Sequence, residues 1–321
     1  MKQSPPPCET ARPPLIELLK NNAFIVELIA ELTEDEPSKI CATLAREHQS
    51  MGTAVREELQ AWQVTPYVWS DRMAEYYGKA NGFLYETLVW NRTGMKHEMR
   101  QWIARFLDAD GLGPQRILVF GDGLGIDSLF LAESGHAVDY YEVSQRCIRF
   151  AKRLSEALGR QFSIVTTPDE VVESSYDAVV CLDVLEHVPD PQRLIDEFRR
   201  ILQPGGELII SASGVFSIHE GPNDFFHFTP FSFRILFARW SGFKMLRGAS
   251  QPFETIGILL QRILIQCRVF PLVRQLVELM VLTVPLLDKC IVSQYSTAGK
   301  LDSEYEIDSM LPSNMQAVVI K

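Results

Sequence analysis

Between residues 116 and 210, short apolar runs alternate with amphipathic segments that are long enough to form helices. The apolar runs cover residues 116–120, 137–141, 162–166, 177–182 and 207–210. Strands that alternate with helices form βαβ units, which place the strands side by side in a mostly parallel sheet. The pattern therefore predicts an α/β fold. In such a sheet, the ligand binds at the carboxyl ends of the strands.

The segments on either side of this pattern have a different character. Apolar residues recur at helical spacing from Leu15 to Trp62 and again through residues 253–292. A final apolar run at residues 315–321 fits a last strand. We divide the chain into a Pro-rich disordered tail (1–14), a helical N-terminal region that forms a lid or the acceptor side (15–108), a ligand-binding core (109–252), a helical insertion with an acidic loop (253–313) and the last strand of the core (314–321).

Net charge and cysteine content limit the classes of function and the cellular compartment that we expect for this chain. The chain of 321 residues has a formal net charge of −10, which argues against nonspecific binding to nucleic acid. Its six cysteines form no CxxC pair, so we expect reduced thiols and a cytoplasmic protein. The N-terminus does not resemble a signal peptide. The longest uncharged run of the most hydrophobic region is residues 279–287. It is far shorter than the roughly 20 residues of a membrane-spanning helix.

A glycine-rich turn follows the first predicted strand directly. It reads Gly121-Asp122-Gly123-Leu124-Gly125 and precedes a predicted helix. Glycine permits the turn and lets a ligand approach the backbone at the helix N-terminus. A dinucleotide fingerprint would need glycine at position 126, which is Ile126. Glu142 ends the second predicted strand, where a carboxylate can accept hydrogen bonds from both hydroxyls of a ribose.

Four ordered segments carry a more specific signal: VFGDGLG, YYEVS, YDAVVCLDVLEHVPD and RRILQPGGELIIS. Together they resemble class I S-adenosylmethionine-dependent methyltransferases, and especially the branch that includes ubiquinone-biosynthesis O-methyltransferases. The resemblance implies a Rossmann-like, mostly parallel seven-stranded sheet with helices on both faces. To this fold the chain adds the helical N-terminal region and the helical insertion before the last strand. The implied activity is O-methylation of a small-molecule or glycan acceptor with S-adenosyl-L-methionine as cofactor.

The resemblance also assigns roles to individual residues. The implied cofactor-binding residues are Gly121, Asp122, Gly123, Gly125, Glu142, Val143, Asp169, Leu182 and Asp183. The three glycines would meet the methionine part, Glu142 would hold the ribose, and Asp169 would contact the adenine amine. One position departs from the family pattern. The acid that usually stands two residues before the first glycine is Val119 here, and Asp122 is the candidate to replace it.

Three histidines are candidates for the general base that an oxygen acceptor requires. His187 follows the fourth predicted strand. His219 and His227 lie in a segment that resembles HExPxDFYRFT of bacterial methyltransferases, with His227 in place of the arginine. Asp183, Glu186 and His187 match the metal-binding Glu-x-x-Glu-His of ubiquinone-type enzymes, although many relatives carry this sequence without a metal.

Two questions stay open on the sequence alone. The apolar residues of the 253–292 block fit either the core or a homodimer face, or an amphipathic surface for a membrane or a lipid-linked acceptor. The fold could also belong to a catalytically silent methyltransferase-like binding module. A nicotinamide-dependent oxidoreductase is a further alternative, against which Ile126 argues.

Overall fold

A computed structural model provides the three-dimensional structure of the chain. It describes residues 14–65, 70–108, 111, 113–160, 162–165, 171–219, 223–292, 294 and 309–321. The expected disorder of residues 1–13 and most of the acidic loop lie outside these ranges, as does Asp169.

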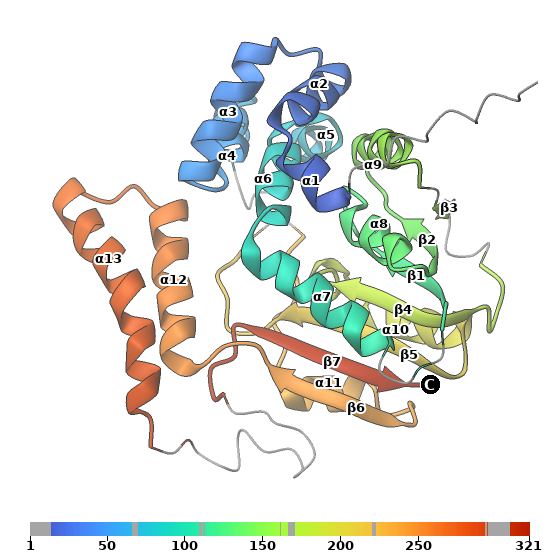
Figure 1. The fold of residues 1–321 in the computed structure, drawn as a ribbon. Coiled ribbons are helices and arrows are strands. Elements are labelled where there is room, and N and C mark those ends of the chain that lie inside the picture. The colour runs from blue at the N-terminus through green and yellow to red at the C-terminus, as the bar shows by residue number, and fades with distance from the viewer. Residues whose placement is uncertain are drawn as a thin grey trace, which may run out of the picture.

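A seven-stranded sheet forms the centre of the molecule, which confirms the predicted fold class (Figure 1). Its strands are β1 (Arg116–Phe120), β2 (Ala137–Tyr141), β3 (Ser163–Val165), β4 (Tyr176–Leu182), β5 (Leu202–Ser213), β6 (Gly242–Gly248) and β7 (Asn314–Ile320). The strand order is β3-β2-β1-β4-β5-β7-β6. The first five strands pair in parallel, whereas β7 runs antiparallel to both β5 and β6.

Helices cover both faces of the sheet because its strands are apolar on both sides. On β1, Leu118 packs in one cluster with α10 and α11, whereas Ile117 and Val119 pack in another with α7 and α8. These helices are α7 (Gly94–Asp108), α8 (Ile126–Glu133), α10 (Pro191–Ile201) and α11 (Pro230–Leu236). Helix α9 (Gln145–Leu158) follows β2, and the short 3-10 helix η2 (Leu185–His187) follows β4.

The N-terminal region is helical, as predicted, and packs on α8 and α9 (Figure 1). It contains α1 (Leu15–Lys20), α2 (Asn22–Thr33), α3 (Pro37–Gln49), α4 (Thr53–Ala61), α5 (Asp71–Lys79) and α6 (Gly82–Asn91). The backbone N–H of Leu15 donates to Glu133 of α8 at 2.9 Å, and Arg153 of α9 pairs with Glu31 of α2 at 2.7 Å. Long-range contacts therefore fix this region to the core.

The second helical block is a hairpin at the side of the molecule (Figure 1). It consists of α12 (Pro252–Gln266), α13 (Pro271–Thr283) and the 3-10 helix η3 (Val284–Cys290). In α12, Leu264 is buried, but α13 has no buried residue although the whole helix is described. Of the alternatives left open for this block, burial in the core does not apply to α13. None of the helices in the described part of the chain is long and apolar enough to span a bilayer.

Candidate functional site

The glycine-rich turn lies where the sequence placed it, between the carboxyl end of β1 and the N-terminus of α8. Gly121, Gly123 and Gly125 have φ angles of 73°, 58° and 70°, which L side chains rarely adopt. A Cβ on Gly121 would lie 2.5 Å from Val184, and a Cβ on Gly125 would lie 2.6 Å from Ala151. The first and third glycines are therefore required by the packing of the core itself.

Gly123 differs from its two neighbours because space remains beside it. The nearest atom to an added Cβ would be a methyl carbon of Thr87 at 3.6 Å. The Tyr140 hydroxyl donates to the Gly123 carbonyl at 2.6 Å, and the Gly123 N–H donates to Glu142 at 2.9 Å. Bonds from β2 thus hold this backbone in place while leaving it approachable. This is the arrangement that a bound cofactor would need.

Glu142 fastens the turn to the end of β2. One carboxylate oxygen accepts from Gly123, and the other accepts from the N–H groups of Val143 and Ser144 at 2.8 and 2.9 Å. Val143 is 76% exposed. The structure therefore brings the glycine turn, Glu142 and Val143 together, as the sequence predicted.

Asp122 has a role that sequence reasoning missed. Its carboxylate accepts from the N–H groups of Asp127 and Ser128 at 3.1 and 2.7 Å, and from the Ser128 hydroxyl at 2.6 Å. These are bonds to the first turn of α8, so the side chain caps that helix. Burial and the nearby charge of Asp127 raise the pKa of Asp122 to about 7.

A buried ion network supports the same helix start from α7. Asp127 pairs with Lys96 at 2.9 Å and with Arg100 at 2.6 Å, and all three side chains are buried. Burial favours the neutral acid, but the two cations outweigh it and lower the pKa of Asp127. The helix that precedes β1 in the chain thus fixes the position of the turn after β1.

The carboxyl end of β4 lies next to the turn, since Val184 approaches Gly121. Leu182 pairs with Ser211 of β5. Asp183 has a φ of 55°, in the left-handed region, and its backbone N–H donates to the Ser211 carbonyl at 3.1 Å. The Asp183 carboxylate accepts from the Ser211 hydroxyl at 2.7 Å and from Asn314 of β7 at 2.8 Å. Asp183 is therefore held by β5 and β7.

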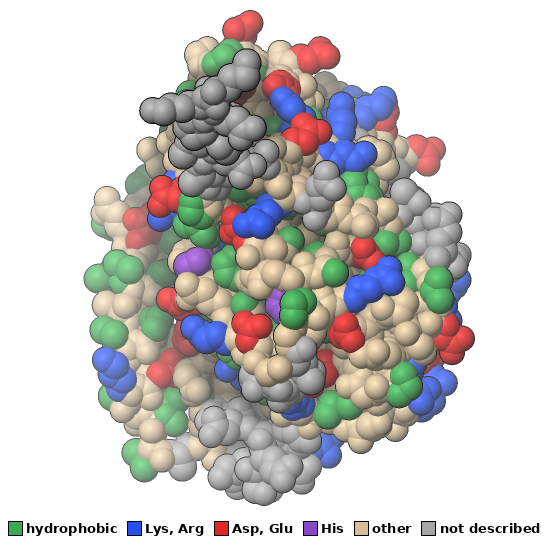
Figure 2. Space-filling view, turned by 45° about the vertical axis from the view of Figure 1, so that its right-hand side comes forward, with side chains coloured by type: hydrophobic (Ala, Val, Ile, Leu, Met, Phe, Trp, Pro, Cys, Tyr) green, Lys and Arg blue, Asp and Glu red, His purple; other side chains and the backbone are tan. Residues whose placement is uncertain are grey.

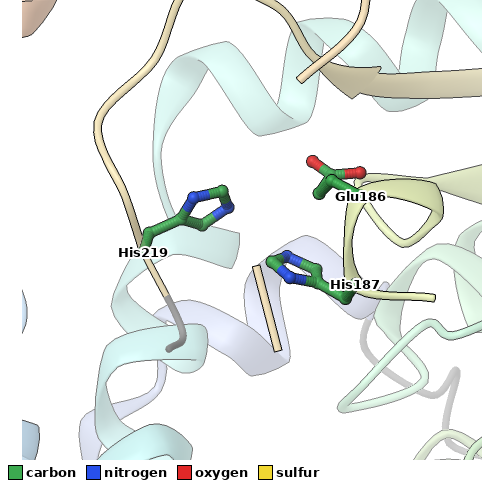
Figure 3. Close-up of side chains that lie close together, drawn as sticks. All are labelled: Glu186, His187 and His219. Carbon is green, nitrogen blue, oxygen red and sulfur yellow. The ribbon is translucent and has the colours of Figure 1, made fainter. Parts of the chain in front are cut away.

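The three candidate histidines lie near one another, close to η2 and β5. The segment that carries His219 and His227 is tied to η2 and β5, because Phe225 N–H donates to the Glu186 carbonyl and Phe228 N–H to the Ser213 carbonyl. The ring centroids of His187 and His219 lie 4.8 Å apart. Those of His219 and His227 lie 6.5 Å apart. The rings of His187 and His219 point toward one another from opposite sides, near the Glu186 carboxylate (Figure 3).

The geometry of His187 defines the tautomer of its neutral ring. Its Nδ1 lies 2.9 Å from the carbonyl oxygen of Asn223. A carbonyl only accepts, so Nδ1 of the neutral ring carries the proton and Nε2 is the basic nitrogen.

Glu186 is fully buried beside this cluster. One of its oxygens accepts from the N–H and hydroxyl of Ser213 at 2.9 and 2.7 Å, and the other has no hydrogen-bond partner among the described residues. Burial, followed by the charge of Asp183, raises the pKa of Glu186 to about 7. Among the described residues, Glu186 and His187 group with His219 as potential metal ligands rather than with Asp183, the third member predicted from the sequence.

Asp224 is the acidic residue that sequence reasoning did not single out. It is 3% exposed and lies between two histidines: one carboxylate oxygen is 3.3 Å from Nδ1 of His219, and the other is 3.5 Å from Nε2 of His227. Its place in the segment resembling HExPxDFYRFT was the signal that could have identified it.

Comparison with known proteins adds the evidence that decides the family. A family profile described as a methyltransferase domain matches residues 91–249, the stretch that contains the glycine turn, Glu142 and the histidine cluster. Residues 91–249 belong to the class I S-adenosylmethionine-dependent methyltransferases. S-adenosylmethionine is therefore the cofactor of this chain, and the open approach to Gly123 and the carboxylate of Glu142 beside it fit that molecule.

Curated relatives of this methyltransferase are similar over part of their length. A ubiquinone biosynthesis O-methyltransferase of Idiomarina loihiensis is 34% identical over 107 residues, which are 32% of this chain and 44% of the relative. One from Pseudomonas savastanoi is 26% identical over 50% of this chain and 64% of the relative. A solved methyltransferase of Archaeoglobus fulgidus has a TM-score of 0.43 at 12% identity, over 69% of this chain and 94% of that one.

Proposed function

We propose that the protein transfers a methyl group from S-adenosylmethionine to an oxygen of a small-molecule or glycan acceptor. The observation that carries the proposal is the glycine turn held against Glu142 at the carboxyl ends of β1 and β2. The relatives named as O-methyltransferases support oxygen as the atom that is methylated. Five cysteines in the described residues are free, which supports a cytoplasmic location.

In this proposal, the residues of the turn hold the cofactor from the side on which Gly123 is open. Glu142 accepts hydrogen bonds from the ribose hydroxyls, and the exposed Val143 lies beside them. Leu182 and Asp183 line the site from β4. Because the Asp122 side chain caps α8, we assign contacts of Asp122 with the methionine part to its backbone.

The cofactor supplies a methyl group on a positively charged sulfonium, and the protein aligns the acceptor with it. The acceptor oxygen forms a bond to the methyl carbon while the bond from that carbon to sulfur breaks. We assign the hydroxyl proton to Nε2 of His187, since Nδ1 already carries a proton. His187 ends η2, directly after the cofactor-side residues of β4.

Calorimetric titration with S-adenosylmethionine and S-adenosylhomocysteine tests the cofactor site. We expect Glu142→Ala to weaken binding by roughly 10- to 100-fold, because charge-assisted hydrogen bonds to the ribose contribute about 1.5–3 kcal/mol. Glu27→Ala, at an exposed position on α2, should bind as the wild type does. Binding that is insensitive to Glu142→Ala would overturn the site.

Transfer of labelled methyl groups to acceptor candidates tests the base. We expect His187→Gln to retain cofactor binding but to lose about 10²- to 10⁴-fold in rate and to lose the acidic limb of the wild-type pH profile, where protonation of the base slows transfer. Cofactor binding by the wild type without transfer to any acceptor would support the silent binding module instead. Binding of a nicotinamide cofactor in its place would support the oxidoreductase.

We also propose that the α12–α13 hairpin contacts a lipid surface or a lipid-linked acceptor. The hairpin is bonded to the acceptor side: Arg262 donates to the Ser217 hydroxyl at 3.0 Å, and Gln266 to the Ile218 carbonyl at 2.6 Å. Those two partners immediately precede His219. The alternative is that the same helices form a homodimer interface. Vesicle binding and the oligomeric state distinguish a lipid contact from a dimer interface.

A further inference from the structure

We infer that His219, Asp224 and His227 form a binding site for a divalent transition-metal ion of the zinc class. The three residues offer ligand atoms that all lie within 4.8 Å of one another. Two imidazoles and one carboxylate form a donor set that suits such ions and leaves a coordination position open.

The spacing of the ligand atoms agrees with that of a metal site. The carboxylate oxygens of Asp224 lie 3.3 Å from Nδ1 of His219 and 3.5 Å from Nε2 of His227. Ligands about 2.1 Å from a tetrahedral ion are separated from one another by about 3.4 Å. Charge-assisted hydrogen bonds between nitrogen and oxygen are shorter, at about 2.7–2.9 Å. The three side chains are therefore close enough to share one ion, which would take Nδ1 of His219 from the Ser217 carbonyl 3.2 Å away.

Burial provides an independent observation. The Asp224 side chain is 3% exposed, and its Oδ1 has no hydrogen-bond partner among the described residues. Its Oδ2 accepts from the backbone N–H of His219 at 2.9 Å. A buried carboxylate is costly unless a cation or several donors compensate it. An ion between the two imidazoles would supply that compensation and would displace any proton from the ligating nitrogens.

The backbone holds this cluster in a defined position. Phe225 N–H donates to the Glu186 carbonyl, and the Asn223 carbonyl accepts from His187, so the residues on either side of Asp224 are fixed to η2. The other grouping of potential ligands is Glu186, His187 and His219. In it, Glu186 also has one oxygen without a hydrogen-bond partner among the described residues, but Nδ1 of His187 is engaged with the Asn223 carbonyl. Asp224, by contrast, stands between the two imidazoles of its own segment.

A role for the ion follows from its neighbours, and this step rests on the proposed function. The ring of His187, the proposed base, lies against the ring of His219. An acceptor oxygen at the open coordination position would have its hydroxyl pKa lowered, and the proton would pass to His187.

The experiment uses the full chain, stripped with a chelator and titrated with Co²⁺ and then Zn²⁺. We expect roughly one ion per chain, visible Co²⁺ absorption bands of a four- or five-coordinate ion, and displacement by Zn²⁺. Asp224→Asn and His227→Arg should each weaken binding at least about tenfold. Arginine keeps a charge partner for Asp224 but cannot ligate a metal. His48→Gln, a histidine of α3 outside the cluster, should bind as the wild type does.

The remaining outcomes separate the interpretations. The thermal unfolding midpoint of each variant shows whether lost binding reflects lost structure, and His227→Arg with an unchanged midpoint makes the comparison decisive. No uptake of Co²⁺ or Zn²⁺ by the wild type would overturn the inference. Loss of binding in Glu186→Gln but not in His227→Arg would also overturn it, because the ion would then belong to the other grouping. Calorimetry with S-adenosylmethionine on the same samples reports separately on the proposed function.

Discussion

At the scale of single residues, the charge on a side chain does not reveal whether it serves a ligand or the fold. Asp122 stands inside the glycine turn, yet its side chain bonds to three donors of α8. Glu142, just after β2, bonds to the turn and is the proposed partner of the ribose. Burial does not separate the two, since both residues are half-buried; the difference lies in the donors that surround each carboxylate.

Asp122 should make stability depend on pH. Its pKa in the folded chain, about 7, exceeds its ordinary value of 3.8, so the folded chain keeps a proton that the unfolded chain has released. Stability from this carboxyl is present at low pH and is lost as the pH rises through 7. From pH 5 to 8, we expect the wild type to lose about 1–3 kcal/mol in unfolding free energy relative to Asp122→Asn, measured by urea denaturation.

The change with pH is the test, because the Asp122→Asn substitution would also alter the cap at every pH. Asp190→Asn provides the control, since Asp190 caps α10 in the same way but is exposed. An unfolding free-energy difference between wild type and Asp122→Asn that stays constant from pH 5 to 8 would contradict the raised pKa.

Residues close in sequence to a motif could be predicted, whereas those that act across the fold could not. The glycine turn, Glu142 and His187 could be predicted because each follows a predicted strand, and His219 and His227 because their segment resembles a family motif. The partners Arg100 and Asp127 are 27 positions apart and lie on different helices. Asp224 becomes notable only when His219 and His227 are seen on either side of it.

At the scale of elements, the three glycines of the turn have different roles. Gly121 and Gly125 are required by packing, whereas Gly123 leaves space for a ligand. Gly125→Ala should destabilise the fold by about 2–4 kcal/mol, because strain at positive φ adds to the clash with Ala151. Gly123→Ala should cost only about 1–2 kcal/mol from strain. Its effect on S-adenosylmethionine affinity should be larger, since the new methyl group would enter the open space. Urea unfolding and calorimetry on both variants measure these effects.

The two variants control one another, since both put alanine at a positive φ in the same turn. Cofactor affinity in Gly123→Ala equal to that of the wild type would mean that the ligand does not approach this backbone.

Elements with a strong pattern were predicted well, and the weaker ones were not. Strands β1 and β2 have the predicted bounds because each is a continuous apolar run. β6 was missed: it reads GFKMLRG, an edge strand with a glycine at each end, and its pairing with β7 skips a position between Phe243 and Met245. β5 extends well beyond the predicted run, because it includes Gln203-Pro204-Gly205-Gly206, which resembles a turn in the sequence.

At the scale of the whole molecule, two helical regions flank the edge of the sheet that carries the site (Figure 1). The N-terminal helices pack on the core through buried apolar residues, but the hairpin does not. Elsewhere, charges of both signs are interspersed over the face seen in Figure 2. The hairpin is different because large apolar side chains remain in solvent: Phe270, Leu272, Val273, Leu276, Leu279, Leu282, Leu286 and Leu287 are all exposed.

The hairpin is slightly basic, with four basic and three acidic side chains. Its acids are engaged locally: Glu278 pairs with Arg274 at 2.9 Å, and Asp288 accepts from two backbone N–H groups of α12 at 2.8 and 2.7 Å. Glu254 accepts at 3.2 Å from the N–H of the residue that precedes α12. Arg268, at the turn, and the lysine of η3 add positive charge in a chain whose net charge is −10. Apolar side chains flanked by basic ones are typical of helices that lie at the membrane surface.

We therefore expect the wild-type chain to sediment with vesicles that contain anionic lipid, and less so as salt increases. Phe270→Ser together with Leu272→Ser should weaken this binding at least about tenfold, since each side chain is 80% or more exposed and contributes about 1.5–3 kcal/mol when buried. Val172→Ser, at an exposed position away from the hairpin, is the control. The hairpin is a homodimer face if the wild type does not bind vesicles and is a dimer in analytical ultracentrifugation, whereas the double variant is a monomer. Its bonds to residues 217 and 218 would then connect the two sites of the dimer rather than a membrane to one site.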